Sequence, residues 1–204
     1  MQIGLFDHVE HGERPLAKLF DERLKFVEAA EAARIYCLHV AEHHATPLNM
    51  VPVPGVYLGA VARTVKRMRL GPLVYLLPLY SPLRLIEEIC MLDHLSHGRL
   101  DVGIGRGVSP YEMKYHKVDH DRSRDIFIDA FKCVSAGLRR IAFSTKASTT
   151  ATRMYRSSCA RCKSRIRRSG TAPPMRSARL GRRAGFAFRH AGTDGDRQGQ
   201  HRCV

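Results

Sequence analysis

Several features that would place the chain in other classes of protein are missing. Its 204 residues contain no apolar run of about 18 residues, the length that a membrane-spanning helix needs. The N-terminal stretch MQIGLFDHVEHGERP carries charge by Asp7 and lacks the apolar segment of a signal peptide. The six cysteines show no paired CxxC spacing of the kind that holds zinc. We therefore expect a cytoplasmic protein that does not contact a membrane.

Acidic side chains are scarce in the C-terminal part of the chain. Residues 141–204 contain 15 Lys and Arg but only two Asp, whereas residues 1–140 contain 19 basic and 17 acidic side chains. The same 64 residues include only seven Leu, Ile, Val or Phe and show no helical or strand period. Such a segment cannot bury enough apolar surface to offset the entropy of ordering it. We predict a globular domain at 1–140 and an irregular, disordered or out-of-frame tail at 141–204.

Two interpretations of this Arg-rich tail remain open. It could act as a basic arm that binds nucleic acid non-specifically, on an otherwise inactive remnant. Alternatively, because 13 of its 15 basic residues are Arg, it resembles a GC-rich gene translated out of frame. Reading the gene in its other frames past codon 140 separates the two, because the second interpretation requires periodic strands and helices there.

Apolar periodicity in residues 1–140 predicts four successive βα units. The helices have amphipathic faces, such as the one that Leu16, Leu19 and Val27 share, and the strands are apolar on both faces. Buried parallel strands have this pattern. A full (β/α)8 barrel needs about 250 residues, so four units form either half of one or an open doubly wound sheet. The predicted strands are 3–7, 35–41, 69–78 and 99–105, and the predicted helices are 15–34, 56–67, 81–96 and 122–138.

Polar and ionisable side chains follow the predicted strands at the point where each one ends. In parallel α/β folds these positions lie at one edge of the sheet, where reactive groups gather. A packing role alone does not predict that alignment, so the pattern indicates a functional site. The residues are Asp7 and His8, then Glu42, His43 and His44, then Pro78, and finally Arg106.

Glycines surround the last of these residues in the stretch GIGRGVSPYE. Gly103, Gly105 and Gly107 would let a ligand approach the backbone, and the Arg106 guanidinium suits bidentate contact with a phosphate. The spacing does not match the dinucleotide-binding fingerprint. Taken alone, this glycine-rich turn is a weak indication of a ligand site.

A metal-dependent barrel hydrolase is the competing hypothesis. Its ligands would come from Asp7, His8, His39, His43 and His44, since barrel hydrolases place histidines at strand ends. Two features oppose it. One histidine, His39, lies inside a predicted strand. The side chains of His43 and His44 leave the backbone in different directions because the two residues are adjacent.

Four segments resemble the luciferase-like flavin monooxygenases, the bacterial luciferase superfamily. They are AEHH (41–44), LGPLVYLLPLYSPLRLIEE (70–88), MLDHLSHGRLDVGIGRG (91–107) and SRDIFIDAF (123–131). The resemblance, which covers residues 1 to about 140, implies the N-terminal half of a (β/α)8 TIM barrel. It also implies an FMN-dependent monooxygenase, in which a separate flavin reductase supplies reduced FMN that reacts with O₂ and a small organic substrate.

The same resemblance implies roles for individual residues. His43 looks like the catalytic histidine and His44 like its supporting neighbour, while Arg106 matches the arginine that binds the FMN phosphate. The Leu73–Val74 bond matches a non-prolyl cis peptide beneath the flavin ring. Gly105, which with Gly107 flanks the arginine, replaces the reactive cysteine of luciferase itself.

The resemblance also has implications for assembly and completeness. Relatives commonly dimerise through helices in this half, so helices 56–67 and 81–96 are the expected homodimer surface. The tail shows no counterpart to the second half of the barrel, which would supply further phosphate ligands and the rest of the pocket. We therefore expect a truncated chain with impaired monooxygenase activity.

Overall fold

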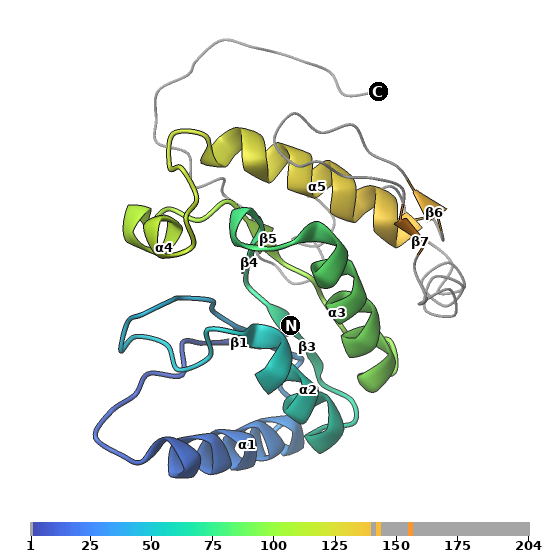
Figure 1. Cartoon of the computed structure of the whole chain (residues 1–204). Helices are drawn as coiled ribbons and strands as arrows, with labels where there is room; N and C mark the ends of the chain where they lie inside the picture. The colour runs from blue at the N-terminus through green and yellow to red at the C-terminus, as the bar shows by residue number, and fades with distance from the viewer. Residues whose placement is uncertain (1, 140–141, 144–154, 157–204) are drawn as a thin grey trace.

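The computed structural model describes residues 2–139, 142–143 and 155–156. Helices and strands alternate along these residues, and the helices lie around the short strands (Figure 1). The elements are β1 (Gly4–Asp7), α1 (Leu16–Ala32), β2 (Cys37–Val40), α2 (Pro54–Thr64), β3 (Arg69–Pro72), β4 (Tyr75–Leu76), a 3₁₀ turn η1 (Leu77–Leu79), α3 (Pro82–Leu95), β5 (Ile104–Gly105), α4 (Pro110–Tyr115), α5 (Ser123–Arg139), β6 (Ala142–Phe143) and β7 (Tyr155–Arg156).

The strands of the domain pair in parallel, as predicted. One sheet has the order β1-β2-β3, and β4 pairs with β5 in a second. The single strand predicted at 69–78 is wrong, because a cis peptide bond between Leu73 and Val74 separates β3 from β4. The cis bond itself confirms what the resemblance implied. The described strands form no closed barrel, and β6 and β7 pair antiparallel within the tail, most of which lies outside the described residues.

The four predicted helices are present within two residues of most of their expected ends. Along α1, Leu19, Val27 and Ala30 are buried, but Leu16 is 44% exposed. We expected Leu16 on the inner face of the helix. It is exposed because it is the first residue of α1, so no earlier helical turn lies beside it. Ser81 is the N-cap residue of α3, and its side chain makes no capping hydrogen bond. Among the described residues, no helix is long and apolar enough to cross a membrane.

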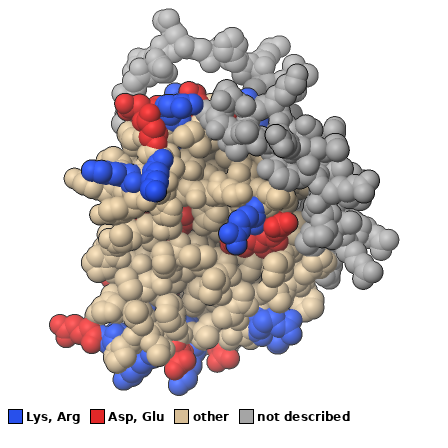
Figure 2. Space-filling view, viewed as in Figure 1, with Lys and Arg blue, Asp and Glu red and all other residues tan. Residues whose placement is uncertain are grey.

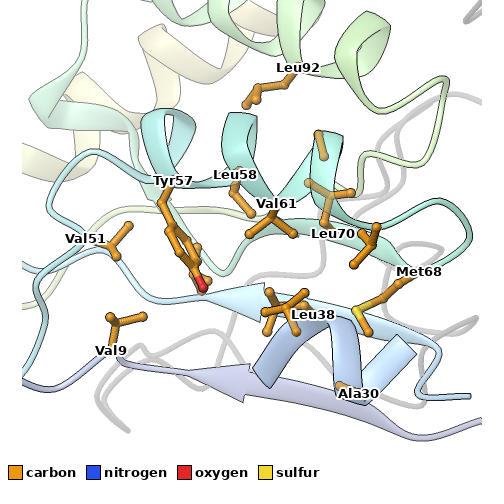
Figure 3. Packing of buried hydrophobic residues seen from close by; sticks show 14 of the residues in the cluster. Val9, Ala30, Leu38, Val51, Tyr57, Leu58, Val61, Met68, Leu70 and Leu92 are labelled. Carbon is orange, nitrogen blue, oxygen red and sulfur yellow. The ribbon is translucent and has the colours of Figure 1, made fainter. Parts of the chain in front are cut away.

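Two apolar clusters hold the domain together. The first lies between β1, β2, β3 and the helices α1 and α2, with Leu38, Leu58 and Leu70 fully buried (Figure 3). Burying one such side chain contributes about 1.5–3 kcal/mol. The second joins β4 to α3 and α5 and contains Cys90 and Cys133. These two cysteines and Cys37 are buried.

A glutamate fastens the N-terminal edge of the sheet, where the strands begin. The carboxylate of Glu31, near the end of α1, accepts the backbone N–H groups of Lys66, Arg67 and Met68 at 2.6–3.1 Å. Partial burial opposes ionisation, but these N–H groups and the nearby Arg67 cation outweigh it and lower the pKa of Glu31. The loop between α2 and β3 is therefore fixed to α1.

Candidate functional site

The loops that leave the strands converge at the C-terminal edge of the sheet. The ring of His8, after β1, stacks on the ring of His43, after β2, with centroids 5.6 Å apart. Glu112, on the helix after β5, bonds His43, and the backbone N–H of Leu76 in β4 bonds Glu42 after β2. Of the predicted group, His8, Glu42 and His43 therefore take part in these contacts, whereas the hydrogen bond of Arg106 in the described residues is to Ser123.

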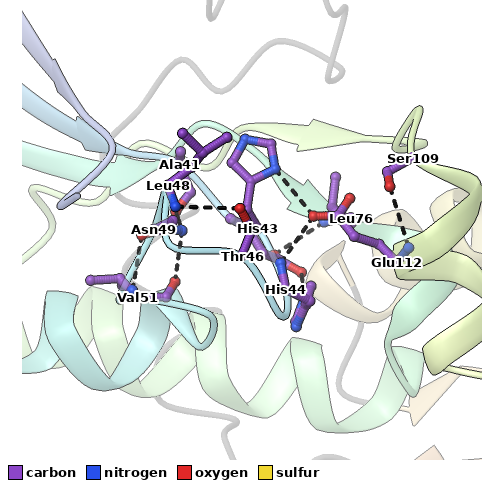
Figure 4. A network of polar contacts seen from close by, with 11 residues as sticks. Ala41, His43, His44, Thr46, Leu48, Asn49, Val51, Leu76, Ser109 and Glu112 are labelled. Atoms are coloured by element: carbon purple, nitrogen blue, oxygen red, sulfur yellow. Dashed lines mark hydrogen bonds and ion pairs between the residues drawn. The ribbon is translucent and has the colours of Figure 1, made fainter. Parts of the chain in front are cut away.

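Backbone hydrogen bonds join the first two of these loops. Met50 N–H donates to the Val9 carbonyl at 3.0 Å, and His11 N–H donates to the Pro47 carbonyl at 3.1 Å. Asn49 is buried and bonds Ala41 and Val51 through its side-chain amide (Figure 4). Because the chain on both sides of His43 is held in this way, the imidazole starts from a fixed backbone position.

The Glu112 carboxylate contacts both His43 and His44. Its Oε1 lies 3.1 Å from His43 Nδ1 and accepts the backbone N–H of His44 at 2.9 Å (Figure 4). The carboxylate is an acceptor, so the proton of a neutral His43 ring lies on Nδ1. The other ring nitrogen, Nε2, then carries a lone pair. It has no protein partner among the described residues, and the side chain is 36% exposed.

Glu42 forms the second half of the network. Its side chain is fully buried. Oε1 lies 3.0 Å from His44 Nε2, while Oε2 accepts from Leu76 N–H at 3.2 Å and from the Tyr80 hydroxyl at 2.9 Å. Burial and the Glu42 carboxylate both raise the pKa of Tyr80, so its hydroxyl stays a proton donor. The two histidines thus face different carboxylates, and Glu42 ties the β2 exit to the β4 exit.

Arg106 extends from the end of β5 toward the beginning of α5. Its Nη1 donates to the Ser123 hydroxyl at 3.2 Å, and Ser123 is fully buried. This is the one hydrogen bond of the Arg106 side chain within the described part of the protein. Arg99 instead donates to the carbonyls of Ser96, Met68 and Ala62 through Nε and both terminal nitrogens. A guanidinium has five N–H donors. Arg106 uses one of them within the described part of the protein and Arg99 uses three, so Arg106 retains more donors for an anion.

Close packing also requires two of the glycines around Arg106. A Cβ on Gly105 would lie 2.5 Å from Val74 Cγ2, and one on Gly103 would lie 2.6 Å from the Pro72 carbonyl oxygen and 3.2 Å from Leu73 Cδ1. These glycines make room for the two residues of the cis peptide. Gly107 differs, because its φ of +83° is a backbone conformation that favours glycine.

The side chains proposed as metal ligands are directed elsewhere. No group of three or more His, Cys, Asp or Glu suited to a metal occurs in the described ranges. Asp7 accepts the Val9 N–H at 2.9 Å and forms an ion pair with Arg23. His39 is buried within β2, where burial lowers its pKa. The hydrolase hypothesis therefore finds no ligand set here.

The sequence analysis missed Glu112 and Tyr80 as site residues. Glu112 lies on α4, a six-residue helix that was not predicted. Its signal was the stretch SPYE, in which Ser109 caps the helix and accepts the Glu112 N–H at 3.3 Å. Glu88, on α3, accepts the Tyr75 hydroxyl at 2.6 Å. Nothing in the local sequence near residue 80 indicated a contact with Glu42.

Comparisons with known proteins show a family to which the chain is similar. The profile of the luciferase-like monooxygenase family matches residues 1–191. The chain is 41% identical over 139 residues to protein y4wF of Sinorhizobium fredii, covering 68% of this chain and 41% of that protein. It is 32% identical over 116 residues to the oxygenase component of flavin-dependent trigonelline monooxygenase from Acinetobacter baylyi, covering 56% of this chain and 32% of that protein.

Solved structures show the same fold. The oxygenating constituent of 3,6-diketocamphane monooxygenase from Pseudomonas putida, in complex with FMN, superposes with a TM-score of 0.71 at 23% identity, over 77% of this chain and 44% of that one. The chain thus spans less than half the length of each of these proteins. The profile match continues past residue 140, whereas the match to y4wF covers 139 residues.

Proposed function

The chain belongs to the luciferase-like monooxygenase family, and on this premise we propose that it binds FMN at the C-terminal edge of its sheet for oxygenation of a small organic substrate. The observation that carries the proposal is the His43 imidazole, which Glu112 holds through Nδ1 while Nε2 has no protein partner in the described part. Reduced FMN, when bound, would supply the electrons that activate O₂.

The residues at this edge fit a flavin phosphate and a proton carrier. Arg106 would bind the phosphate through the nitrogens that Ser123 does not engage, since a guanidinium forms strong bidentate contacts with phosphates. Leu73 and Val74, at the cis peptide, would form the wall beneath the flavin ring, next to Gly105 and Gly107.

His43 would accept or donate a proton at Nε2 near the substrate. The Glu112 carboxylate stabilises the imidazolium that forms when Nε2 gains a proton. His44 would act indirectly, because its ring is bound to the buried Glu42 and its backbone N–H to Glu112. It fixes the loop from which His43 projects.

Two partners follow from the proposal. The relative from Acinetobacter baylyi is named as an oxygenase component, so we propose that a separate reductase supplies the reduced flavin to this chain as well. A homodimer through α2 and α3 is supported by Val56 and Met91, which are 75% and 61% exposed. Figure 2 shows few charged side chains over these helices.

Flavin binding tests the proposal directly. The full chain is titrated with FMN while flavin fluorescence is followed, together with the variants Arg106→Ala and Arg124→Ala. Arg124 is exposed on the first turn of α5 and serves as the matched control. We expect Arg106→Ala to weaken binding about tenfold or more and Arg124→Ala to leave it unchanged. Absence of FMN binding by the unaltered chain would refute the proposal.

Turnover is tested with photoreduced FMN and O₂ consumption. His43→Asn should leave FMN affinity intact and lower the rate about 100-fold, the contribution typical of a general acid or base. The control is His94→Asn, an exposed imidazole at the end of α3. The proposed impairment of this chain predicts FMN binding with slow turnover. Stoichiometric FMN binding with rapid O₂ consumption would refute the impairment and leave the flavin function standing.

A further inference from the structure

We propose that His8 is a positioning residue for the His43 imidazole, which it restrains through the ring face while Glu112 restrains it through Nδ1. The inference rests on the proposed function of His43 as the proton carrier. It assigns a role to a residue that stands at the end of β1 and that the proposed flavin site does not otherwise use.

Three rings, those of Phe6, His8 and His43, form a row at the ends of the first two strands. The His8 and His43 rings are nearly parallel, with an interplanar angle of 9° and centroids 5.6 Å apart. The edge of Phe6, in β1, packs against His8 at a centroid distance of 4.9 Å and an angle of 70°. The His8 ring therefore contacts both the Phe6 ring and the His43 ring.

The backbone fixes the position from which His8 projects. On one side, Asp7 accepts the Val9 N–H at 2.9 Å and pairs with Arg23 at 3.4 Å. On the other, Val9 is fully buried and its carbonyl accepts the Met50 N–H. Val9 has a φ of +48°, a backbone conformation that is sterically costly for a β-branched residue. The surrounding contacts offset this cost and keep His8 aimed at His43.

The Glu112 contact alone does not determine the plane of the His43 ring. One hydrogen bond to Nδ1 fixes the position of that atom but permits the ring to tilt around the bond, and the direction of the Nε2 lone pair tilts with it. The His43 side chain is 36% exposed, so few other atoms limit this motion. A parallel ring on its face removes the tilt, because stacked aromatic rings resist rotation out of plane. Two contacts in different directions then orient Nε2.

Ring substitutions at position 8 separate positioning from proton chemistry. His8→Phe keeps a planar ring and removes both nitrogens, whereas His8→Ala removes the ring. His11→Ala is the matched control, since His11 lies in the same loop and its side chain makes no ring contact or hydrogen bond in the described structure. The ¹⁵N chemical shifts of the His43 ring, measured on the full chain without flavin, report its tautomer, with Glu112→Ala as the positive control.

We expect the unaltered protein, His8→Phe and His11→Ala to show one Nδ1–H tautomer of His43. His8→Ala should shift both ring nitrogens toward the values of exchanging tautomers. In the oxygenation assay, His8→Ala should lower kcat about tenfold at unchanged FMN affinity, the effect of a misoriented catalytic group, and His8→Phe should restore most of the rate. The thermal midpoint of each variant verifies folding, and His8→Tyr replaces His8→Phe if the latter unfolds.

Two results would overturn the proposal. If His8→Ala leaves the His43 nitrogen shifts and kcat unchanged, the stack does not position the ring. If His8→Phe lowers kcat as much as His8→Ala does, an imidazole nitrogen at position 8 is required and the role is chemical. The NMR measurement needs no flavin, so it remains decisive even if the unaltered chain fails to bind FMN and the proposed function is wrong.

Discussion

The two edges of the parallel sheet use carboxylates in different ways. At the N-terminal edge, Glu31 accepts three consecutive backbone N–H groups and fixes a loop. At the C-terminal edge, Glu42 and Glu112 each contact a histidine ring as well as a backbone N–H. A carboxylate that accepts hydrogen bonds from backbone N–H groups alone stabilises the fold. One that holds an imidazole by one nitrogen leaves the other nitrogen available for chemistry.

The arginines repeat this contrast. At the N-terminal edge Arg69 forms a bidentate ion pair with Asp101, and Arg99 donates to three carbonyls. At the C-terminal edge Arg106 contacts Ser123 through Nη1. Both edges are rich in ionisable groups, so the number of charges does not identify the functional edge. What distinguishes it is the presence of donors and acceptors that the described protein atoms leave unused.

The largest expected effect is on stability and comes from Glu42→Ala. Removing this fully buried carboxylate leaves the Leu76 N–H and the Tyr80 hydroxyl without their acceptor, which costs about 3 kcal/mol of unfolding free energy. Urea denaturation followed by circular dichroism measures the loss. The control is Glu87→Ala, on α3, which should change stability by less than about 0.5 kcal/mol. Equal losses of unfolding free energy in the two variants would show that the hydrogen bonds of Glu42 do not stabilise the fold.

Glu112→Ala should affect catalysis more than folding, in contrast to Glu42. Loss of the Nδ1 partner frees the His43 tautomer and the ring orientation, so we expect kcat to fall about 100-fold. FMN affinity should not change, because Glu112 contacts no residue proposed to bind the phosphate. Glu112→Gln retains a carbonyl acceptor and should recover part of the rate. Lys114→Ala, on the exposed side of α4, is the control; a Glu112→Ala enzyme with the unaltered rate would contradict the assigned role.

The contrast between these glutamates explains what the sequence could predict. His43, His44 and Arg106 could be predicted as site residues because each follows an apolar strand, and chain order alone brings such positions to one edge. Glu112 was missed because its contact with His43 spans 69 residues and depends on how α4 packs. The break between β3 and β4 was likewise invisible to periodicity, since the run 69–78 is apolar throughout. The resemblance located the cis bond within it.

Glu31→Gln tests the structural edge and should have a moderate effect that depends on pH. The pKa of Glu31 is lowered in the folded protein, so its stabilisation is present above the unfolded value near 4.5 and is lost as pH falls through the folded pKa. At pH 7 we expect a loss of about 1 kcal/mol, since solvent screens the partly exposed carboxylate. The difference from the unaltered chain should shrink on acidification, measured by urea midpoints between pH 7 and 3. The proposed His43 chemistry should be unaffected; a loss of turnover per folded molecule would contradict the separation of the two edges.

The smallest expected effect comes from relieving an unfavourable backbone conformation after one helix at each edge of the sheet. Two residues after the end of both α1 and α4 stands a residue other than glycine at positive φ, Arg34 at +63° and Lys117 at +57°. In both, the next N–H bonds back to the last turn, from Ile35 to Ala30 and from Val118 to Met113. Glycine is favoured at this position.

Arg34→Gly and Lys117→Gly should therefore each raise the unfolding free energy by about 0.5–1 kcal/mol. Glycine removes the steric cost of the left-handed conformation, and its greater freedom in the unfolded chain cancels part of that gain. The Ala variants at the same positions remove the charge but keep the Cβ, so they should show no gain. Only α4 carries Glu112, so Lys117→Gly should also slow amide exchange along that helix and narrow the His43 ring signals, whereas Arg34→Gly should leave both unchanged. If both glycine variants altered the His43 signals, the two edges would be coupled through the sheet, and the division between a structural and a functional edge would have to be abandoned.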